Sequence, residues 1–144
     1  AIDFLEGNAF SHYEISNYAR PGFESQHNQA YWAGYDYLGL GPGAVSTITG
    51  QRWKTVPDTA AYVKRSKAGI DTRTEIEILT EEDRRIEAIA LQLRTRRGIP
   101  TELIPSPNPI ESLTQQGLIL KNDGFITLSR EGKSLADPIA AELI

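Results

Sequence analysis

Residues 113–129 read LTQQGLILKNDGFITLS and hold the strongest structural signal in the chain. Two apolar runs, 118–120 and 125–128, flank the turn-forming tripeptide Asn122-Asp123-Gly124. Turn chemistry of this type between two strand-forming runs predicts a β-hairpin. A short antiparallel pair of strands is therefore expected near the end of the chain.

Helices are expected on both sides of this hairpin. Gly117 provides a stop signal, which predicts a helix over residues 109–116. Ser129 is a typical N-cap residue, so a final helix is expected over residues 130–143, with a disturbance at Pro138.

A longer helix is expected upstream, from Thr80 to Arg97. Thr80 and Asp83 resemble a capping box with the shorter acid, and Gly98 suits the position that follows a helix end. The apolar stripe of this helix recurs at helical intervals and consists of Ile86, Ile89, Ala90 and Leu93. Helix, helix, hairpin and helix in this order are typical of a winged-helix domain, a pattern that carries no function by itself.

The basic residues Arg94, Arg96 and Arg97 match the negative end of the helix dipole and are interpreted as a solvated helix terminus. Residues 58–144 carry 12 Lys and Arg against 14 Asp and Glu. Nucleic-acid-binding domains are usually strongly basic on the docking face, so no nucleic-acid partner is expected.

The first half of the chain is richer in strands and turns. Residues 12–18, HYEISNY, contain strand formers and predict one strand. Alternation places Glu14 on one face and Asn17 on the other, so both faces carry polar atoms. A strand that ends at a ligand cavity would explain this pattern, and a solvated edge strand would explain it equally well.

Turn and cap signals predict the remaining elements. They are the end of a helix over 1–9, a turn at 20–22, one or two helical turns over 27–32, a strand over 37–40, a hairpin over 44–56, a helix over 57–67 with Pro57 at its first position, and a strand over 74–79.

Composition limits the classes of protein. The 144 residues are 40% hydrophobic and 24% charged, which excludes a disordered or fibrous chain, and the net charge is −4. The sequence contains no cysteine, so a disulfide scaffold, a thiolate iron–sulfur site and a cysteine nucleophile are excluded within it. His12 and His27 show no ligand spacing, so no metal site is predicted. No apolar run spans a bilayer and no signal segment is seen, so the cytoplasm is the expected compartment.

The character of the chain changes near Pro57. Residues 1–57 hold both Trp, both His and five of the six Tyr, whereas residues 58–144 hold most of the charge. Two domains are therefore expected, over 1–57 and 58–144. Because the sequence contains no methionine, we expect it to be part of a longer protein.

Two features of the first half are candidates for a chemical role. Gly39, Gly41 and Gly43 form either a tight turn or a backbone surface that contacts a cofactor. His27 and Tyr31 lie on one face if the segment is helical, and imidazole and phenolate are both axial ligands of haem iron. Residues four apart on one helix cannot bind one iron from opposite sides of a porphyrin, and a structural histidine remains an alternative.

Taken together, several stretches resemble one family. They are YEISNYARPG at 13–22, HNxxYW at 27–32, DYLGLGPGA at 36–44, and LRT at 93–95 with Gly98-Ile99. The chain resembles the C-terminal portion of a radical-SAM protein of the oxygen-independent coproporphyrinogen III oxidase group, and within it the HemW haem-chaperone branch. The resemblance extends over nearly the whole sequence.

The resemblance implies an α+β fold: the edge of a partial β/α barrel in residues 1–57 and a winged-helix-like helical domain in residues 58–144. It implies haem binding by His27, Asn28 and Tyr31, a position near S-adenosylmethionine for Gly43, Ala44 and Val45, and a cavity position for Glu14 and Asn17. It also implies a [4Fe–4S] cluster held by cysteines of the upstream barrel, which this chain lacks. Without that cluster, the 144 residues alone are expected to be inert as a radical enzyme.

The sequence departs from the family at two places. Val45 stands where relatives often have histidine, and the stretch from Ile99 to Leu118 is short and broken by prolines. Three hypotheses follow: part of a haem chaperone in tetrapyrrole metabolism, with an acceptor protein as a further partner; part of a coproporphyrinogen III oxidase; or a winged-helix module that binds protein.

Overall fold

A computed structural model describes residues 2–144, and these fall into two compact units. The first unit combines the residues up to Gly34 with Arg85–Ile144, and the second is Tyr35–Arg84. The boundary that composition indicates near Pro57 does not coincide with this division, because it lies inside the second unit. No helix in the described part of the chain is both long and apolar enough to cross a membrane.

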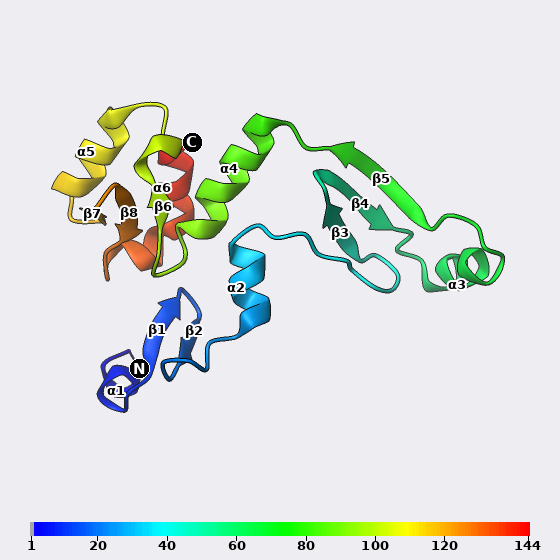
Figure 1. Cartoon of the computed structure of the whole chain (residues 1–144), viewed down its shortest axis with the longest axis horizontal. Helices are drawn as coiled ribbons and strands as arrows, with labels where there is room; N and C mark the ends of the chain where they lie inside the picture. Colours follow the sequence, from blue (N-terminus) through cyan, green and yellow to red (C-terminus); the bar gives the residue numbers. More distant parts are fainter. Residues whose placement is uncertain (1) are drawn as a thin grey trace. The chain divides into compact units, whose positions relative to one another are not determined.

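The C-terminal part of the first unit consists of helices around a small sheet (Figure 1). Its elements are α4 (Glu81–Gln92, whose first turn belongs to the second unit), β6 (Ile99–Pro100), the 3₁₀ turn η1 (Thr101–Leu103), α5 (Pro107–Gln115), β7 (Ile119–Asn122), β8 (Phe125–Leu128), the 3₁₀ turn η2 (Gly132–Leu135) and α6 (Ala136–Leu143). The three strands are antiparallel in the order β6-β8-β7. The predicted hairpin is thereby confirmed, and β6 extends it to three strands.

The hydrophobic core of the molecule lies in this part. Ile89 and Leu93 of the predicted stripe are almost completely buried, at 0% and 1% exposure. They pack with buried apolar residues from α5, α6 and the three strands, and with Ile104 after η1. The full set is Ile99, Ile104, Ile110, Leu113, Ile119, Ile126, Leu128, Ala136, Ile139, Ala140 and Leu143. Ile86 and Ala90 are half-buried at the edge of this core.

The start of α4 follows the predicted capping box. The Thr80 amide donates to Asp83 Oδ2 at 2.8 Å, and the Asp83 amide donates to Thr80 Oγ1 at 3.1 Å. The Thr80 hydroxyl also donates to Asp83 Oδ2, at 2.6 Å. This bond first, and then the bond from the Thr80 amide, hold the pKa of Asp83 below its usual range.

The predicted end of this helix at Arg97 is wrong, because α4 ends at Gln92. The next residues turn toward β1 of the same unit instead. The Arg96 amide donates to Tyr13 O at 3.0 Å, and Thr95 forms an isolated bridge with Glu14. These tertiary hydrogen bonds replace the last helical turn that local propensity favours.

The two C-terminal helices also differ from prediction. Helix α5 begins at Pro107 because Ser106 Oγ accepts from the Asn108 amide. The single helix expected over 130–143 is η2 followed by α6. Ser129 Oγ accepts from the Gly132 amide at 3.0 Å, and Pro138 lies in the first turn of α6, where its missing N–H is not needed.

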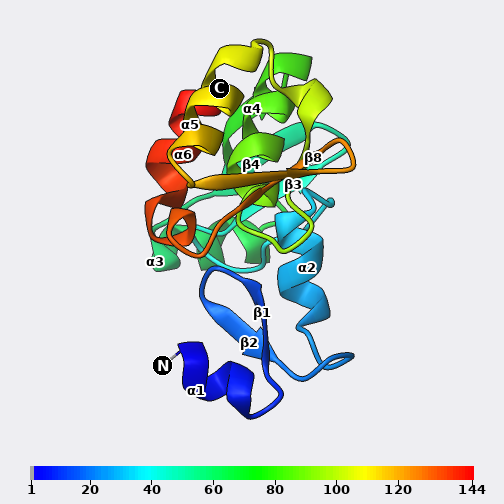
Figure 2. The same cartoon turned by 90° about the vertical axis from the view of Figure 1, so that its left-hand side faces the viewer.

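The N-terminal part of the first unit contains α1 (Ile2–Gly7), β1 (Ser11–Glu14), β2 (Asn17–Ala19) and α2 (Gln26–Trp32). Figure 2 shows the β1–β2 hairpin with α1 and α2 on either side of it. The single strand predicted over 12–18 is therefore wrong, since His12 and Tyr18 face each other across a hairpin. The predicted helices near 1–9 and 27–32 are present, and Ala1 lies outside the described residues.

The second unit is a three-stranded antiparallel sheet with one helix. Its elements are β3 (Val45–Ile48), β4 (Gln51–Thr55), α3 (Thr59–Lys67) and β5 (Arg73–Ile78), with strand order β3-β4-β5. The predicted hairpin and the strand near 74–79 are confirmed. Only Tyr37 of the strand predicted over 37–40 is paired, by a bridge to Thr47. Helix α3 is capped by Asp58, so the start predicted at Pro57 is wrong.

Candidate functional site

Helix α2 carries the His27-Asn28-x-x-Tyr31 motif on a surface of the first unit. Ser25 caps the helix, and its Oγ accepts from the Asn28 amide at 3.3 Å. His27 is exposed, Asn28 is half-buried and Tyr31 is 43% exposed. Because positions four apart share one helix face, the imidazole and the phenol lie on adjacent turns of that face.

The end of α2 contacts the C-terminal body of the same unit. The Tyr31 and Trp32 rings meet edge to face, with their centroids 5.4 Å apart. The Arg94 guanidinium lies over the Trp32 ring, 5.7 Å from its centroid, and forms an ion pair with Asp137. Arg97 similarly lies over Phe125. The interpretation of this basic cluster as a solvated helix terminus is therefore wrong for Arg94, which is half-buried, whereas Arg97 is exposed but lies beyond the end of α4.

The hairpin β1–β2 brings Glu14 and Asn17 together. Glu14 is only 2% exposed, and its Oε1 accepts from the Ser16 amide at 2.9 Å and from Asn17 Nδ2. The carboxylate thus satisfies the backbone and side chain of its own turn. This local hydrogen bonding explains why polar residues appeared on both faces of the predicted strand.

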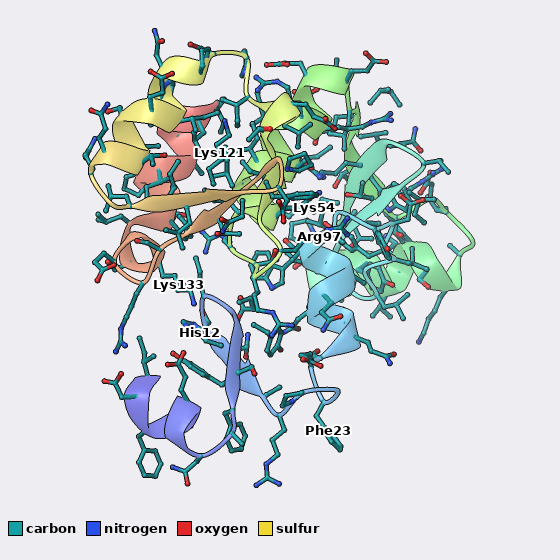
Figure 3. The ribbon with its side chains drawn as sticks, turned by 60° about the vertical axis from the view of Figure 1, so that its left-hand side comes forward. His12, Phe23, Lys54, Arg97, Lys121 and Lys133 are labelled. Atoms are coloured by element: carbon teal, nitrogen blue, oxygen red, sulfur yellow. The ribbon has the colours of Figure 1, made fainter. Side chains whose placement is uncertain are left out.

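A second polar contact, partly buried and not predicted from the sequence, joins His12 and Lys133. His12 Nε2 donates to Ile15 O at 2.9 Å, so its Nδ1 accepts from Lys133 Nζ at 2.9 Å. The imidazole stacks on Tyr18 with ring centroids 4.2 Å apart. Burial lowers the pKa of Lys133. Figure 3 shows these two side chains reaching toward each other from β1 and η2, which are 121 residues apart in the chain.

An open hollow of about 400 Å³ lies beside β2. It is lined by Phe10, Tyr18, Ala19, Arg20 and Phe23, with the Arg20 guanidinium 5.4 Å from the centroid of Phe10. None of the site residues predicted from sequence lines this hollow.

The glycine segment belongs to the second unit. Gly39 allows a close approach, since a Cβ there would lie 2.2 Å from Val45 O. The Gly43 amide donates to Val56 O at 3.2 Å, and the Ala44 amide donates to Thr55 Oγ1 at 3.0 Å. Any contact of Gly43 or Ala44 with a cofactor would therefore use groups other than these two amides. The Val45 side chain is 37% exposed at the start of β3.

The side-chain donors of this chain fit one of the groups that the resemblance implies and do not fit another. The exposed imidazole of His27 and phenol of Tyr31 fit haem, because both are known axial ligand types. The residues do not fit a [4Fe–4S] cluster, because the sequence contains no cysteine. Among residues 2–144, no group of three or more His, Asp or Glu side chains is arranged to hold a metal ion.

Comparison with solved structures shows which known fold the chain resembles. The chain resembles coproporphyrinogen III oxidase (HemN) from Escherichia coli, a radical SAM enzyme, with a TM-score of 0.74 over 99% of this chain and 38% of that one. The sequences are 16% identical, so the likeness shows the fold alone. The fold is thus an α+β arrangement found within a radical-SAM enzyme. No family model matches the chain.

Curated sequences give the particular relatives. The heme chaperone HemW of Lactococcus lactis is 37% identical over 101 residues, which cover 70% of this chain and 26% of that protein. HemW of Bacillus subtilis is 30% identical over 146 residues, covering 94% and 38%. The mitochondrial radical S-adenosyl methionine domain-containing protein 1 of Bos taurus is 29% identical, covering 97% and 36%.

The chain is therefore a homologue of the HemW haem chaperones and of radical-SAM domain proteins, which confirms the resemblance predicted from its motifs. It spans between 26% and 38% of the length of these curated relatives.

Proposed function

We propose that this chain is the C-terminal portion of a HemW-like haem chaperone and contributes its haem-binding helix. The observation that carries the proposal is the exposure of His27 and Tyr31 on one face of α2, within a sequence whose relatives are named heme chaperones. The parent acts in tetrapyrrole metabolism in the cytoplasm, and its further partner is a protein that accepts haem.

Haem binding at α2 uses one iron ligand from this helix. His27 and Tyr31 lie on the same side of the helix, so they cannot occupy both axial positions of one iron. The second residue then hydrogen-bonds the bound group or replaces the first ligand in another state. Asn28 supports the site because its backbone amide donates to the Ser25 hydroxyl that caps the helix.

The radical-SAM chemistry of the parent depends on residues outside this chain. The cluster would be held by cysteines of an upstream barrel, and there it would supply the reducing chemistry that acts on S-adenosylmethionine. Gly43, Ala44 and Val45 form part of the wall near S-adenosylmethionine, and Glu14 and Asn17 contribute to the cavity. Since the amides of Gly43 and Ala44 are already bonded, this wall acts by shape and by its remaining backbone groups.

Hemin titration followed by absorbance tests the haem proposal. The variants are His27→Ala and Tyr31→Phe, and the matched control is Gln29→Ala. Gln29 is exposed on the same helix, but it is two residues from each of them and so does not share their face. We expect the substitution of whichever residue binds the iron to weaken hemin binding by about tenfold or more, equivalent to ~1.4 kcal/mol, and to change the Soret spectrum. Unchanged affinity and spectrum in both variants would remove the motif from the account.

A second candidate function is the oxidative decarboxylation (decarboxylating dehydrogenation) of coproporphyrinogen III by the parent protein. It is supported by the likeness of the fold to HemN. An assay of the full-length protein, with reduced cluster and S-adenosylmethionine, for formation of protoporphyrinogen decides between the two functions. Product formation favours the oxidase, and haem transfer without product favours the chaperone.

A further inference from the structure

Trp32, the last residue of α2, is held by its ring contacts. Its indole Nε1 is buried and has no hydrogen-bond partner among the residues that the structure describes. Buried indole N–H groups usually find an acceptor, so this ring is not oriented by a polar bond. Its ring instead meets the Tyr31 ring edge to face and lies under the guanidinium of Arg94.

Arg94 is well placed to orient this ring. It follows Leu93, which is 1% exposed in the core, so the backbone beneath Arg94 is anchored. The Arg94 side chain is 27% exposed and donates through Nη2 to the carboxylate of Asp137 at the start of α6. The carboxylate of Asp137 thus holds the guanidinium at one nitrogen, while the guanidinium lies over the Trp32 ring.

We propose that Arg94 is a positioning residue for the haem-binding motif. It fixes Trp32, and through the edge-to-face contact it fixes the phenol of Tyr31. The inference rests on the proposed function, because Tyr31 is a residue of the motif proposed to bind haem. It gives a role to the Arg of the LRT sequence at 93–95, which the haem proposal does not use.

The arrangement requires arginine rather than any cation. A guanidinium is planar, so it lies flat on an indole while its N–H edge donates to a carboxylate. A lysine at this position keeps the charge and can still pair with Asp137, but its compact ammonium does not cover the ring. Lysine therefore tests stacking separately from charge.

Fluorescence of Trp32 reports its environment without haem. The chain contains two tryptophans, so Trp53→Phe leaves Trp32 as the sole tryptophan, which is excited selectively over tyrosine at the red edge of the absorption band. In this background we compare Arg94→Ala, Arg94→Lys and the control Arg96→Ala. Arg96 is exposed and lies two residues further along the same segment after α4. Acrylamide quenching and hemin affinity are measured for each, and circular dichroism checks that each variant folds.

We expect Arg94→Ala to raise the quenching constant of Trp32 about twofold, because one ring face is uncovered. Hemin affinity falls about two- to fivefold, the size of a half-exposed cation–π contact. Arg94→Lys gives an intermediate quenching constant, and Arg96→Ala behaves as the parent chain does. If Arg94→Ala fails to fold, Arg94→Lys carries the test, since it retains the ion pair.

Two results would overturn the inference. One is a quenching constant for the Arg94 variants equal to that of Arg96→Ala. The other is a raised quenching constant with unchanged hemin affinity, while His27→Ala or Tyr31→Phe weakens binding. Failure of the proposed function looks different: hemin affinity is then insensitive to His27 and Tyr31 themselves, whatever happens to Trp32.

Discussion

Replacing Gly98 by alanine should destabilise the first unit far more than an ordinary glycine substitution. Gly98 has φ +70°, a conformation that alanine adopts at a cost of about 1–2 kcal/mol. A Cβ at this position would also lie 1.9 Å from Ile126 O and 2.7 Å from Thr127 Cγ2. Both contacts are with β8, so the substitution must push apart two paired strands of the small sheet.

The size of this loss follows from the two costs that the structure identifies, the left-handed backbone and the steric overlap. Overpacking in a well-packed region costs about 1–3 kcal/mol beyond the conformational term, so Gly98→Ala is expected to lose about 2–5 kcal/mol of unfolding free energy. Gly117 is the matched control: its φ is +71°, and a Cβ there meets open space. Gly117→Ala is therefore expected to lose only the conformational cost of about 1–2 kcal/mol.

Urea denaturation followed by circular dichroism measures both variants against the parent chain. The expected result is a lower midpoint for Gly98→Ala than for Gly117→Ala, at an unchanged slope. Equal midpoints for the two variants would refute the close approach of Gly98 to β8, since their backbone conformations are the same.

Three further experiments test other contacts. Thr80→Ala removes the cap of α4 and should cost about 1 kcal/mol in urea denaturation, whereas Thr114→Ala, inside α5, leaves α4 intact. The folded-state pKa of Asp83 is lowered, so its stabilising contribution is present above its unfolded pKa near 3.8 and is lost as pH falls through the folded pKa. Asp83→Asn should therefore flatten the acid part of the plot of unfolding free energy against pH. An unaltered plot would contradict the capping bonds. His12→Phe keeps a ring over Tyr18 but leaves Lys133 and Ile15 O without their partner, so it should cost about 1–3 kcal/mol, while the exposed His27→Phe changes stability little; equal urea midpoints would count against the buried contact.

The positions of Arg94 and Gly98 give a physical basis for one of the motifs that carried the resemblance. LRT at 93–95 and Gly98-Ile99 contain a core residue, a guanidinium on Trp32 and a glycine against β8. None of these roles needs contact with a cofactor. The motif is explained by packing within the first unit, including its contact with α2.

The local signals predicted most elements correctly where one short stretch determines the result. The capping box at Thr80 and Asp83 and the hairpin around Asn122-Asp123-Gly124 depend on neighbours in the chain, and both are present. The strand predicted over 12–18 failed because Glu14 folds back onto Ser16 and Asn17, an alternative that alternation of side chains does not reveal.

The site divides in the same way. His27 and Tyr31 on one exposed helix face were predictable, since a spacing of four and a Ser25 cap are local properties. The pairing of His12 with Lys133 was not, because the two residues are 121 positions apart and neither carries a motif for the other. The same holds for Arg94 over Trp32, a contact that joins α2 to the turn after α4 and that local propensity does not reveal.

By itself, the amino-acid sequence determined the absence of cluster cysteines, the haem-type donors on α2, the hairpin and the kinship to HemW. These follow from residue identity and from interactions between near neighbours. Only the tertiary structure decided that α4 ends at Gln92, that Glu14 is buried in its own turn and that Arg94 covers Trp32. Those outcomes depend on backbone and side-chain groups from distant segments competing for the same partners, and such competition is settled only when the chain is packed.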